Sequence, residues 1–166
     1  MAYRLRKPFA AFRIADGRRP VFDASGAALF GGRWNSAGRR VIYAAETYSG
    51  ALLERLIHSN IGRVPKHHVW VRIEIPAGVR VEEIREEELP GWADADESAS
   101  RRFGDQWYDE GRSAVLLVPS VVSRVERNVV INEAHPEFGE ISAQVPRSVV
   151  WDKRLFGGME NRERNR

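Results

Sequence analysis

The chain has 166 residues, of which 43% are hydrophobic and 30% are charged, and its formal net charge is +3 at pH 7. That length and composition fit one globular domain with a hydrophobic core of ordinary size. Without a cysteine the chain can form neither a disulfide nor a thiol nucleophile, and no apolar run approaches the ~20 residues that cross a bilayer. Because no secretory signal opens the sequence, we expect a soluble cytoplasmic protein, although the absence of cysteine also fits other compartments.

The charges are distributed unevenly along the chain. Residues 1–40 contain nine lysines and arginines against two aspartates, whereas residues 82–97 contain eight carboxylates against one arginine. The N-terminal part should therefore attract anions. Nucleic acid and a pyrophosphate-bearing nucleotide are both candidates, and a solvated basic face without a specific partner is the simplest alternative.

The first part of the chain is expected to hold little regular structure. A short extended piece at residues 3–5 is followed by an irregular stretch, punctuated by proline and glycine, up to Gly32. A short apolar strand is then predicted at residues 39–44 and a helix at residues 47–60. The apolar residues of this helix fall on one stripe at 3.6-residue spacing: Leu52, Leu53, Leu56 and Ile57.

The rest of the chain alternates strands with one further helix. Residues 82–97 should form an acidic surface connection with at most a short helix, and residues 97–110 a helix in which Phe103 and Trp107 share the buried face. We expect residues 157–166, which are polar and charged, to be disordered. The pattern therefore predicts a compact α+β domain with a mixed sheet and flanking helices. Further strands are predicted at residues 69–75, 115–118, 128–132 and around 149–151.

One stretch, residues 31–54, combines residue types that suit a binding site. The pair Gly31-Gly32 can take positive φ and approach a ligand closely, and Arg33 offers a planar fork of donors suited to phosphate. Tyr43 is expected near the end of the following strand, and Glu54 at the edge of the helical stripe, where it could line a cleft. Taken alone, such a glutamate is more often solvated, and the arginine and tyrosine are more often salt-bridge and core residues.

The common catalytic and metal-binding motifs are missing from the sequence. It has no Walker-type phosphate loop, no G-x-G-x-x-G after a strand and no G-x-S-x-G elbow. Its four histidines form no H-x-x-x-H or H-E-x-x-H pair, and adjacent His67 and His68 would point to opposite faces of a strand, so no metal site is expected. Ser120 with His135 and an aspartate could imitate a catalytic triad, but a serine after Pro119 is more often a turn residue.

Taken together, the motifs resemble those of the RES domain, a family named for its arginine, glutamate and serine. The resemblance covers residues 1–156 and rests on the order and spacing of short motifs. The sequence departs from the family at Glu133, where a proline often follows the asparagine. The motifs that carry the resemblance are Gly26-Ala27, Gly31-Gly32-Arg33-Trp34-Asn35, Gly38, Tyr43, Ala51-Leu52-Leu53-Glu54, Trp107, Val118-Pro119-Ser120, Asn128, Ile131-Asn132, His135-Pro136, Asp152 and Arg154-Leu155.

The resemblance implies a toxin of a two-gene toxin–antitoxin system with a fold similar to that of ADP-ribosyltransferases. Such a toxin consumes NAD as a substrate by breaking its nicotinamide–ribose bond, with water or phosphate as acceptor, and needs no further cofactor. Transfer of ADP-ribose to a protein is a second reading, and a non-enzymatic module that binds nucleic acid or the antitoxin is a third. The implied partner is an Xre-type helix-turn-helix antitoxin that covers the active site. The toxin would be a homodimer within the complex and would reach DNA only through the antitoxin.

The resemblance also implies roles for particular side chains. Glu54 would stabilise the oxocarbenium-like ribose, Arg33 would hold the phosphates, and Tyr43 would stack on nicotinamide or ribose. We expect these three side chains to converge on one cleft. An asparagine after a strand is also a common turn cap. The remaining residues expected to place the ligand or a water molecule are Ser120, Asn35 and Asn132.

Overall fold

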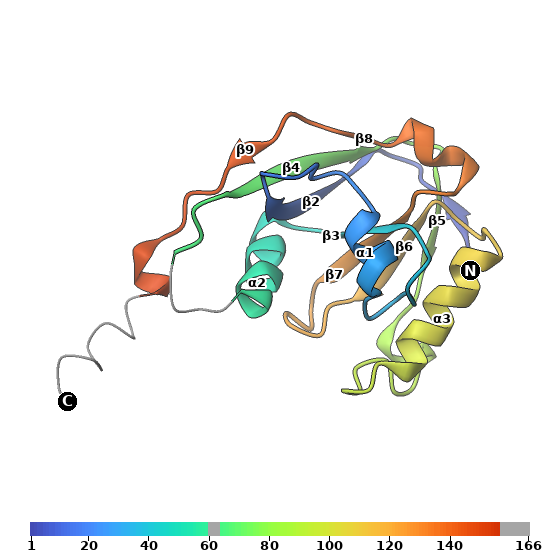
Figure 1. The fold of residues 1–166 in the computed structure, drawn as a ribbon. Helices are drawn as coiled ribbons and strands as arrows, with labels where there is room; N and C mark the ends of the chain where they lie inside the picture. Colours follow the sequence, from blue (N-terminus) through green and yellow to red (C-terminus); the bar gives the residue numbers. More distant parts are fainter. Residues whose placement is uncertain (60–63, 157–166) are drawn as a thin grey trace.

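The computed structural model describes residues 1–59 and 64–156. Its centre is one nine-stranded sheet in the order β1-β5-β6-β7-β3-β2-β4-β8, with β9 also pairing with β4 (Figure 1). The β5–β6 pair is parallel and the other pairs are antiparallel. The predicted α+β fold with a mixed sheet is therefore confirmed.

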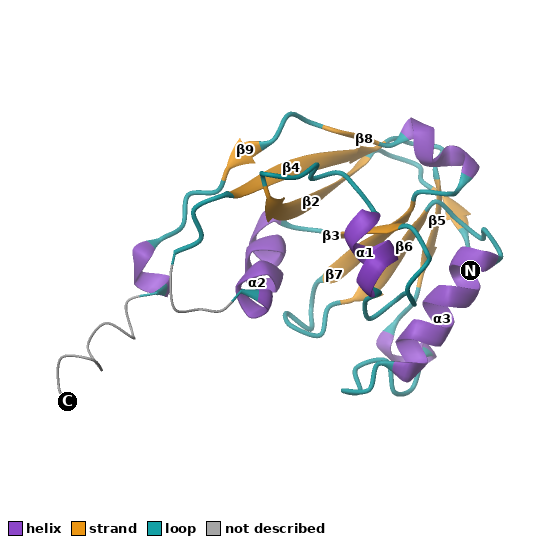
Figure 2. Cartoon of the chain, in the orientation of Figure 1, coloured by secondary structure: helices purple, strands orange, loops and turns teal. Residues whose placement is uncertain are grey.

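Helices flank this sheet, and Figure 2 distinguishes them from the strands by colour. The strands are β1 (Tyr3–Arg4), β2 (Phe9–Asp16), β3 (Val41–Ala45), β4 (His68–Ile75), β5 (Arg80–Glu83), β6 (Val115–Pro119), β7 (Arg127–Asn132), β8 (Ser142–Ala143) and β9 (Arg147–Ser148). The helices are α1 (Ser25–Phe30), α2 (Tyr48–His58) and α3 (Ser98–Asp109), with short 3₁₀ helices η1 (Glu86–Glu88), η2 (Pro136–Glu140) and η3 (Lys153–Leu155).

Strands β6 and β7 form the middle of the core. Every residue of β6 is buried, as expected of an uninterrupted apolar run that is covered on both faces. Because successive side chains point to opposite faces of a sheet, Leu117 and Ile131 pack on one face with residues of β2 and β4. Leu116 and Val130 pack on the other face with Trp107 of α3. Helix α3 therefore covers one face of the central strands.

The sheet is divided between β2 and β3. Strand β2 pairs with β4 along all eight of its residues, and β3 pairs with β7 along all five. Between β2 and β3, in contrast, the register contains the single pair Phe12↔Ala45. The two halves of the sheet therefore meet at one point and diverge from it, with β2 and β4 above β3, β7 and β6 in Figure 2.

Helix α2 begins directly after β3 and packs on the sheet beside this division. Thr47 caps the helix, because its Oγ1 accepts the backbone N–H of Gly50 at 2.9 Å. Ala51 is buried in a cluster with residues of β2 and β3. Of the predicted apolar stripe, however, Leu53 and Ile57 are 39% and 55% exposed. The stripe as a whole does not face the core.

Several segments differ from the sequence-based predictions. Strand β2 and helix α1 lie in the stretch expected to be irregular, and β5 overlaps the start of the expected acidic connection. Strand β5 tolerates its charges because Glu82, 7% exposed, is paired with Nε of Arg112 at 3.1 Å. The strand predicted around residues 149–151 is wrong, because β9 ends at Ser148 and Val150 is 90% exposed.

The structure does not describe residues 60–63 and 157–166, on which two of the predictions fall. The disorder predicted for residues 157–166 and the end of the first helix at Asn60 lie outside the described residues. Across the described part of the chain, none of the helices combines the length and apolarity that a bilayer crossing requires.

Gly104 sets how closely α3 approaches the loop after α1. A Cβ atom on Gly104 would lie 1.8 Å from the carbonyl oxygen of Trp34. That oxygen belongs to the backbone, so it cannot move aside without moving the loop. The side chain of Trp34 is itself buried and meets Phe103 of α3 edge to face. The helix and the loop can therefore approach this closely only because residue 104 has no side chain.

We predict that Gly104→Ala lowers the free energy of unfolding by roughly 1–3 kcal/mol, because the added methyl group overpacks a backbone contact. Gly139→Ala is the matched control, since a Cβ atom there would have no heavy atom of the described residues within 4 Å beyond the glycine and its chain neighbours, and it should change the stability by no more than about 0.5 kcal/mol. Urea unfolding of both variants measures the difference. Equal midpoints would show that the α3–loop contact accommodates a methyl group.

Candidate active site

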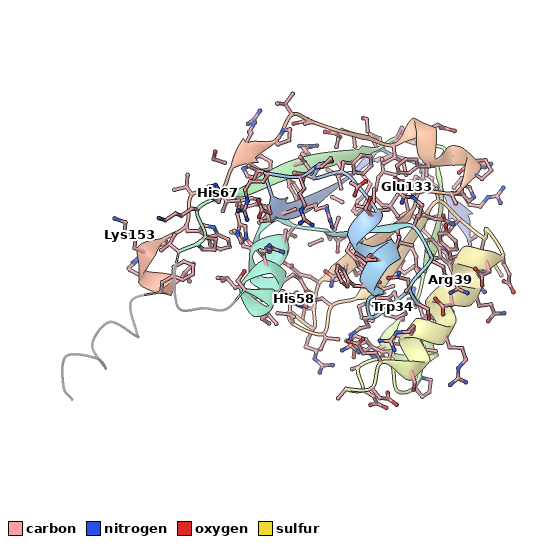
Figure 3. The ribbon with its side chains drawn as sticks, viewed as in Figure 1. Trp34, Arg39, His58, His67, Glu133 and Lys153 are labelled. Atoms are coloured by element: carbon pink, nitrogen blue, oxygen red, sulfur yellow. The ribbon has the colours of Figure 1, made fainter. Side chains whose placement is uncertain are left out.

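An open cleft of ≈ 550 Å³ lies where the two halves of the sheet diverge. Its walls come from β2, β3 and α2, from α1 and the loop that follows it, and from the loop after β6. His58 of α2 and Trp34 of the loop after α1, which both line the cleft, are labelled in Figure 3. A cleft of this size suits a small-molecule ligand. The polar side chains that line it are Arg13, Arg33, Tyr43, Glu54, Arg55, His58, Glu97 and Asn128.

Glu54 is held in one orientation at this cleft. Its Oε1 accepts a hydrogen bond from Nδ2 of Asn128 at 2.7 Å and another from Oγ of Ser120 at 3.1 Å. Within residues 1–59 and 64–156, the other carboxylate oxygen, Oε2, has no hydrogen-bond partner, so it is available to a ligand. These contacts distinguish Glu54 from a solvated surface glutamate, because Asn128 of β7 and Ser120, which follows β6, fix its carboxylate.

Ser120 acts on the cleft through Glu54. Its side chain is buried, and its Oγ accepts the backbone N–H groups of Val122 at 3.2 Å and Ser123 at 3.1 Å. With both acceptor positions used, the hydroxyl hydrogen is directed at the carboxylate of Glu54. Ser120 follows β6, and Asn128 lies opposite Val118 in the β6–β7 register. The hairpin between these strands therefore presents both donors to Glu54.

Tyr43 presents its ring to the cleft, while its hydroxyl group is bound within the protein. It lies in the middle of β3 rather than near its end, opposite Val130 in the register. The hydroxyl donates to Oδ1 of Asn35 at 2.7 Å and accepts the backbone N–H of Trp34 at 3.0 Å. Burial raises the pKa of Tyr43 above its ordinary value. The phenol is therefore uncharged and suited to contact rather than to proton transfer.

Asn35 holds the loop after α1 instead of lining the cleft. It is fully buried, and its Nδ2 donates to the carbonyl groups of Ala27 at 2.9 Å, Ser36 at 3.1 Å and Arg39 at 3.3 Å. Its Oδ1 accepts from Tyr43. The structure thus gives Asn35 a structural position behind the cleft, and not the substrate contact that the sequence suggested.

The guanidinium of Arg33 borders the cleft but is engaged by protein groups. Its Nη1 donates to the carbonyl oxygens of Trp92 and Asp94, each at 3.0 Å. Its Nη2 lies 3.3 Å from Oε1 of Glu97. The fork that was expected to grip phosphate therefore binds the segment before α3 in this conformation.

Arg13 also lines the cleft, although no sequence motif indicated it. Its Nε donates to the carbonyl of Val21 and its Nη1 to the carbonyl of Tyr43, each at 2.7 Å. Burial lowers the pKa of Arg13, and the nearby charge of Arg55 lowers it further, whereas Asp23 acts in the opposite direction. The one basic residue of β2 could have indicated this position, because it lies in the basic N-terminal region. Residues 6–32 were expected to be irregular, so no strand was predicted there.

Arg55 provides a second cation next to Arg13. Its Nε donates to Nε2 of His68 at 3.1 Å. Among the described residues, neither Arg13 nor Arg55 has a carboxylate within the 4.0 Å of an ion pair. Two guanidinium groups without a bound carboxylate make this part of the cleft attractive to an anion.

Asn132 does not reach the cleft. It is 1% exposed and lies opposite Val41 in the register, whereas Asn128 lies opposite Ala45. Four residues along a strand separate the two asparagines by about 13 Å. The Oδ1 of Asn132 accepts the backbone N–H of Ala134 at 2.9 Å, which is the turn-capping alternative. No group of three or more potential metal ligands is found in the described part of the chain.

Comparisons with known proteins connect these features to a family. The family model described as RES domain matches residues 3–152. The Prs ADP-ribosylating toxin of Sphingobium sp. (strain YBL2) is 40% identical over 138 residues, which cover 81% of this chain and 86% of that protein. Toxin Res of Pseudomonas putida is 34% identical over 136 residues, which cover 81% of this chain and 92% of that protein.

A solved structure shares the fold. It is the crystal structure of the M. tuberculosis MbcT-MbcA toxin–antitoxin complex, one chain of which matches with a TM-score of 0.74 at 15% identity, over 89% of this chain and 87% of that chain. With a family model that spans nearly the whole sequence and relatives above 30% identity, the chain belongs to the RES domain family of toxins.

Proposed function

We propose that this toxin depletes NAD by cleaving the bond between nicotinamide and ribose. The observation that carries the proposal is the carboxylate of Glu54, a residue that lines the cleft. Its Oε1 is bound by Ser120 and Asn128, while its Oε2 has no partner among the described residues. Departure of nicotinamide leaves positive charge on the ribose, which a fixed carboxylate stabilises. Nicotinamide leaves as a neutral base, so the reaction requires no strong general acid.

The diphosphate of NAD is best matched by Arg13 and Arg55. Both line the cleft, and neither is paired with a carboxylate in the described part of the chain. Arg33 is a weaker match because its donors are bound to two backbone carbonyl groups and to Glu97. The ring of Tyr43 supplies a flat apolar surface for nicotinamide or ribose.

The group that accepts ADP-ribose distinguishes two versions of this proposal. Water or phosphate as acceptor makes the enzyme a glycohydrolase or a phosphorylase. The name of the Sphingobium relative, an ADP-ribosylating toxin, favours the alternative in which a protein side chain is the acceptor. Incubation of the purified protein with NAD, with and without phosphate and with a bacterial lysate, followed by mass spectrometry, identifies the product. Unchanged NAD under all these conditions would contradict both versions.

We further propose that an antitoxin of the Xre type covers the cleft. The structural neighbour of this chain was solved as a toxin–antitoxin complex. A cleft lined by two arginines that have no carboxylate partner among residues 1–59 and 64–156 would attract a carboxylate at a chain end. Under this proposal the toxin is a homodimer in the complex, and both proteins act in the cytoplasm, where NAD is available.

Glu54→Gln tests the catalytic carboxylate. Glutamine keeps the shape and much of the hydrogen bonding but removes the negative charge, so NAD turnover should fall by roughly 10²-fold or more, while the melting temperature should stay close to that of the wild type. The matched control is Glu87→Gln, at an exposed position outside the cleft, which should change neither quantity. NAD consumption and melting are measured on the same samples. Wild-type turnover by Glu54→Gln would remove Glu54 from the mechanism.

Arg55→Gln tests the cationic side of the cleft. Loss of one guanidinium should raise the KM for NAD by about tenfold or more, with a smaller effect on kcat, because a contact to the diphosphate is present both before and during bond cleavage. Arg102→Gln, which removes an exposed arginine of α3 outside the cleft, is the control for the change in net charge. If both variants keep the wild-type KM, the diphosphate binds elsewhere.

Growth assays test the antitoxin. Expression of the toxin alone should arrest growth, and co-expression with the neighbouring helix-turn-helix gene should restore it, because a bound chain end would block NAD from the arginines of the cleft. A soluble complex that forms while growth stays arrested would show that the antitoxin does not act by covering the site.

A further inference from the structure

His68, the first residue of β4, contacts a cation of the cleft from outside the cleft. Its Nε2 lies 3.1 Å from Nε of Arg55, which lines the cleft. The half-buried imidazole packs on the buried indole of Trp151, with ring centroids 5.8 Å apart. The other ring nitrogen, Nδ1, is buried and has no hydrogen-bond partner within the described ranges. The contact with Arg55 is therefore the polar contact that orients the ring.

This contact requires a neutral imidazole. The Nε of an arginine always carries a hydrogen, so Nε2 of His68 must supply a lone pair, and the ring hydrogen must be on Nδ1. Burial lowers the pKa of His68, and the positive charge of Arg55 lowers it further, whereas Asp16 acts in the opposite direction. The surroundings thus favour the protonation state that can accept from Arg55.

The charged groups on the neighbouring elements do not replace Arg55 as the partner of His68. Strand β2 places Asp16 opposite His68 in the register, but the carboxylate of Asp16 is bound by Arg18. Strand β9 contributes Arg147, whose guanidinium lies over an indole ring, 5.5 Å from its centroid. The segment after β9 contributes an uncharged indole. Helix α2 therefore provides the hydrogen-bonding partner, Arg55.

We propose that His68 is a positioning residue of the cleft: its neutral imidazole accepts the Nε–H of Arg55 and leaves the Nη groups of that guanidinium free to bind an anionic ligand. The identity of the ligand, the diphosphate of a dinucleotide, rests on the proposed function, but the coupling of His68 to Arg55 does not. A partner outside the cleft orders a long side chain before the ligand arrives, which reduces the rotamer freedom lost on binding.

The proposal also gives the cleft a pH dependence. Protonation of His68 removes the acceptor at Nε2 and places two positive charges next to each other, so Arg55 loses its anchor. Because the pKa of His68 is lowered in the folded protein, the anchored state is fully present above the ordinary histidine pKa. It is lost as the pH falls through the lowered value.

The coupling is tested first without a ligand, in a Glu54→Gln background so that the protein can be produced without toxicity. The Nε–H signal of Arg55, identified by its absence from Arg55→Lys, is followed in ¹⁵N spectra. It should exchange slowly with water in the parent protein and in His68→Gln, because glutamine retains an acceptor of similar reach. It should exchange rapidly in His68→Leu. His67→Leu changes the exposed neighbouring histidine and should keep the slow exchange.

Binding of ADP-ribose, which contains the diphosphate but no nicotinamide, is then measured by calorimetry on the same proteins. At about pH 8 the parent protein and His68→Gln should bind alike, and His68→Leu on the order of tenfold more weakly, which is the scale of ordering one long side chain. As the pH falls toward about 5, where histidine titrates, the parent should approach His68→Leu. His68→Gln should change much less, because its side chain does not titrate.

Two results would overturn the proposal. One is a His68→Leu protein with the parent's Nε–H exchange and affinity. The other is a His68→Gln protein that behaves like His68→Leu, since the shape of histidine and not its acceptor would then matter. If the parent protein binds no ADP-ribose at any pH, the assignment of the diphosphate to this cleft fails, and the Nε–H signals alone decide whether His68 orders Arg55.

Discussion

The divided sheet and the cleft both depend on the guanidinium of Arg13. Strands β2 and β3 share one residue pair and separate beyond it, so backbone groups that face the gap need other partners. Arg13 supplies one such partner, because its Nη1 donates to the carbonyl of Tyr43 in β3 at 2.7 Å, and its Nε also donates to the carbonyl of Val21 in the segment after β2 at 2.7 Å. The side chain that makes these hydrogen bonds also brings a positive charge into the cleft. Burial and the nearby charge of Arg55 both disfavour the charged form of Arg13. An anionic ligand would compensate that charge. The free-energy cost of burying the guanidinium would then be reduced on binding, which favours an anionic ligand at this point.

The opposite wall of the cleft is fixed by uncharged hydrogen bonds that belong to the core. Asn35 is fully buried, donates to one carbonyl group of α1 and two of its own loop, and accepts from the hydroxyl of Tyr43. Helix α3 supports the same loop from behind, where Gly104 touches the backbone of Trp34. A buried network whose members all have partners fixes one conformation. The loop that borders the cleft is therefore held both by this network and by its contact with α3.

Sequence patterns predict those parts of the structure in which the local pattern of apolar and polar residues already indicates which side chains are buried. The apolar strands β6 and β7 and the amphipathic helix α3 are examples. They do not predict segments whose burial depends on a distant partner. Arg13 in β2 and Glu82 in β5 look like surface residues until the gap in the sheet and the pairing with β6 are known. Asn128 and Asn132 lie near the two ends of one apolar strand, and its pairing alone decides which of them reaches the cleft. Arg33 has the chemistry to bind phosphate, but the carbonyl groups that engage it come from a segment about 60 residues away.

Helix α2 reconciles two opposite demands of the proposed chemistry. An anionic dinucleotide whose ribose becomes positively charged needs a cation at the diphosphate and a carboxylate at the ribose, yet the two protein charges would pair with each other if nothing held them apart. Consecutive helical residues differ in direction by about 100°, and each of these two has its own anchor. Glu54 is bound by Ser120 and Asn128 from the β6–β7 half of the sheet, whereas Arg55 is bound by His68 from the β4 half. The adjacent residues Glu54 and Arg55 of α2 are thus each bound to a different half of the sheet. The divergence of the two halves therefore keeps the two charges apart.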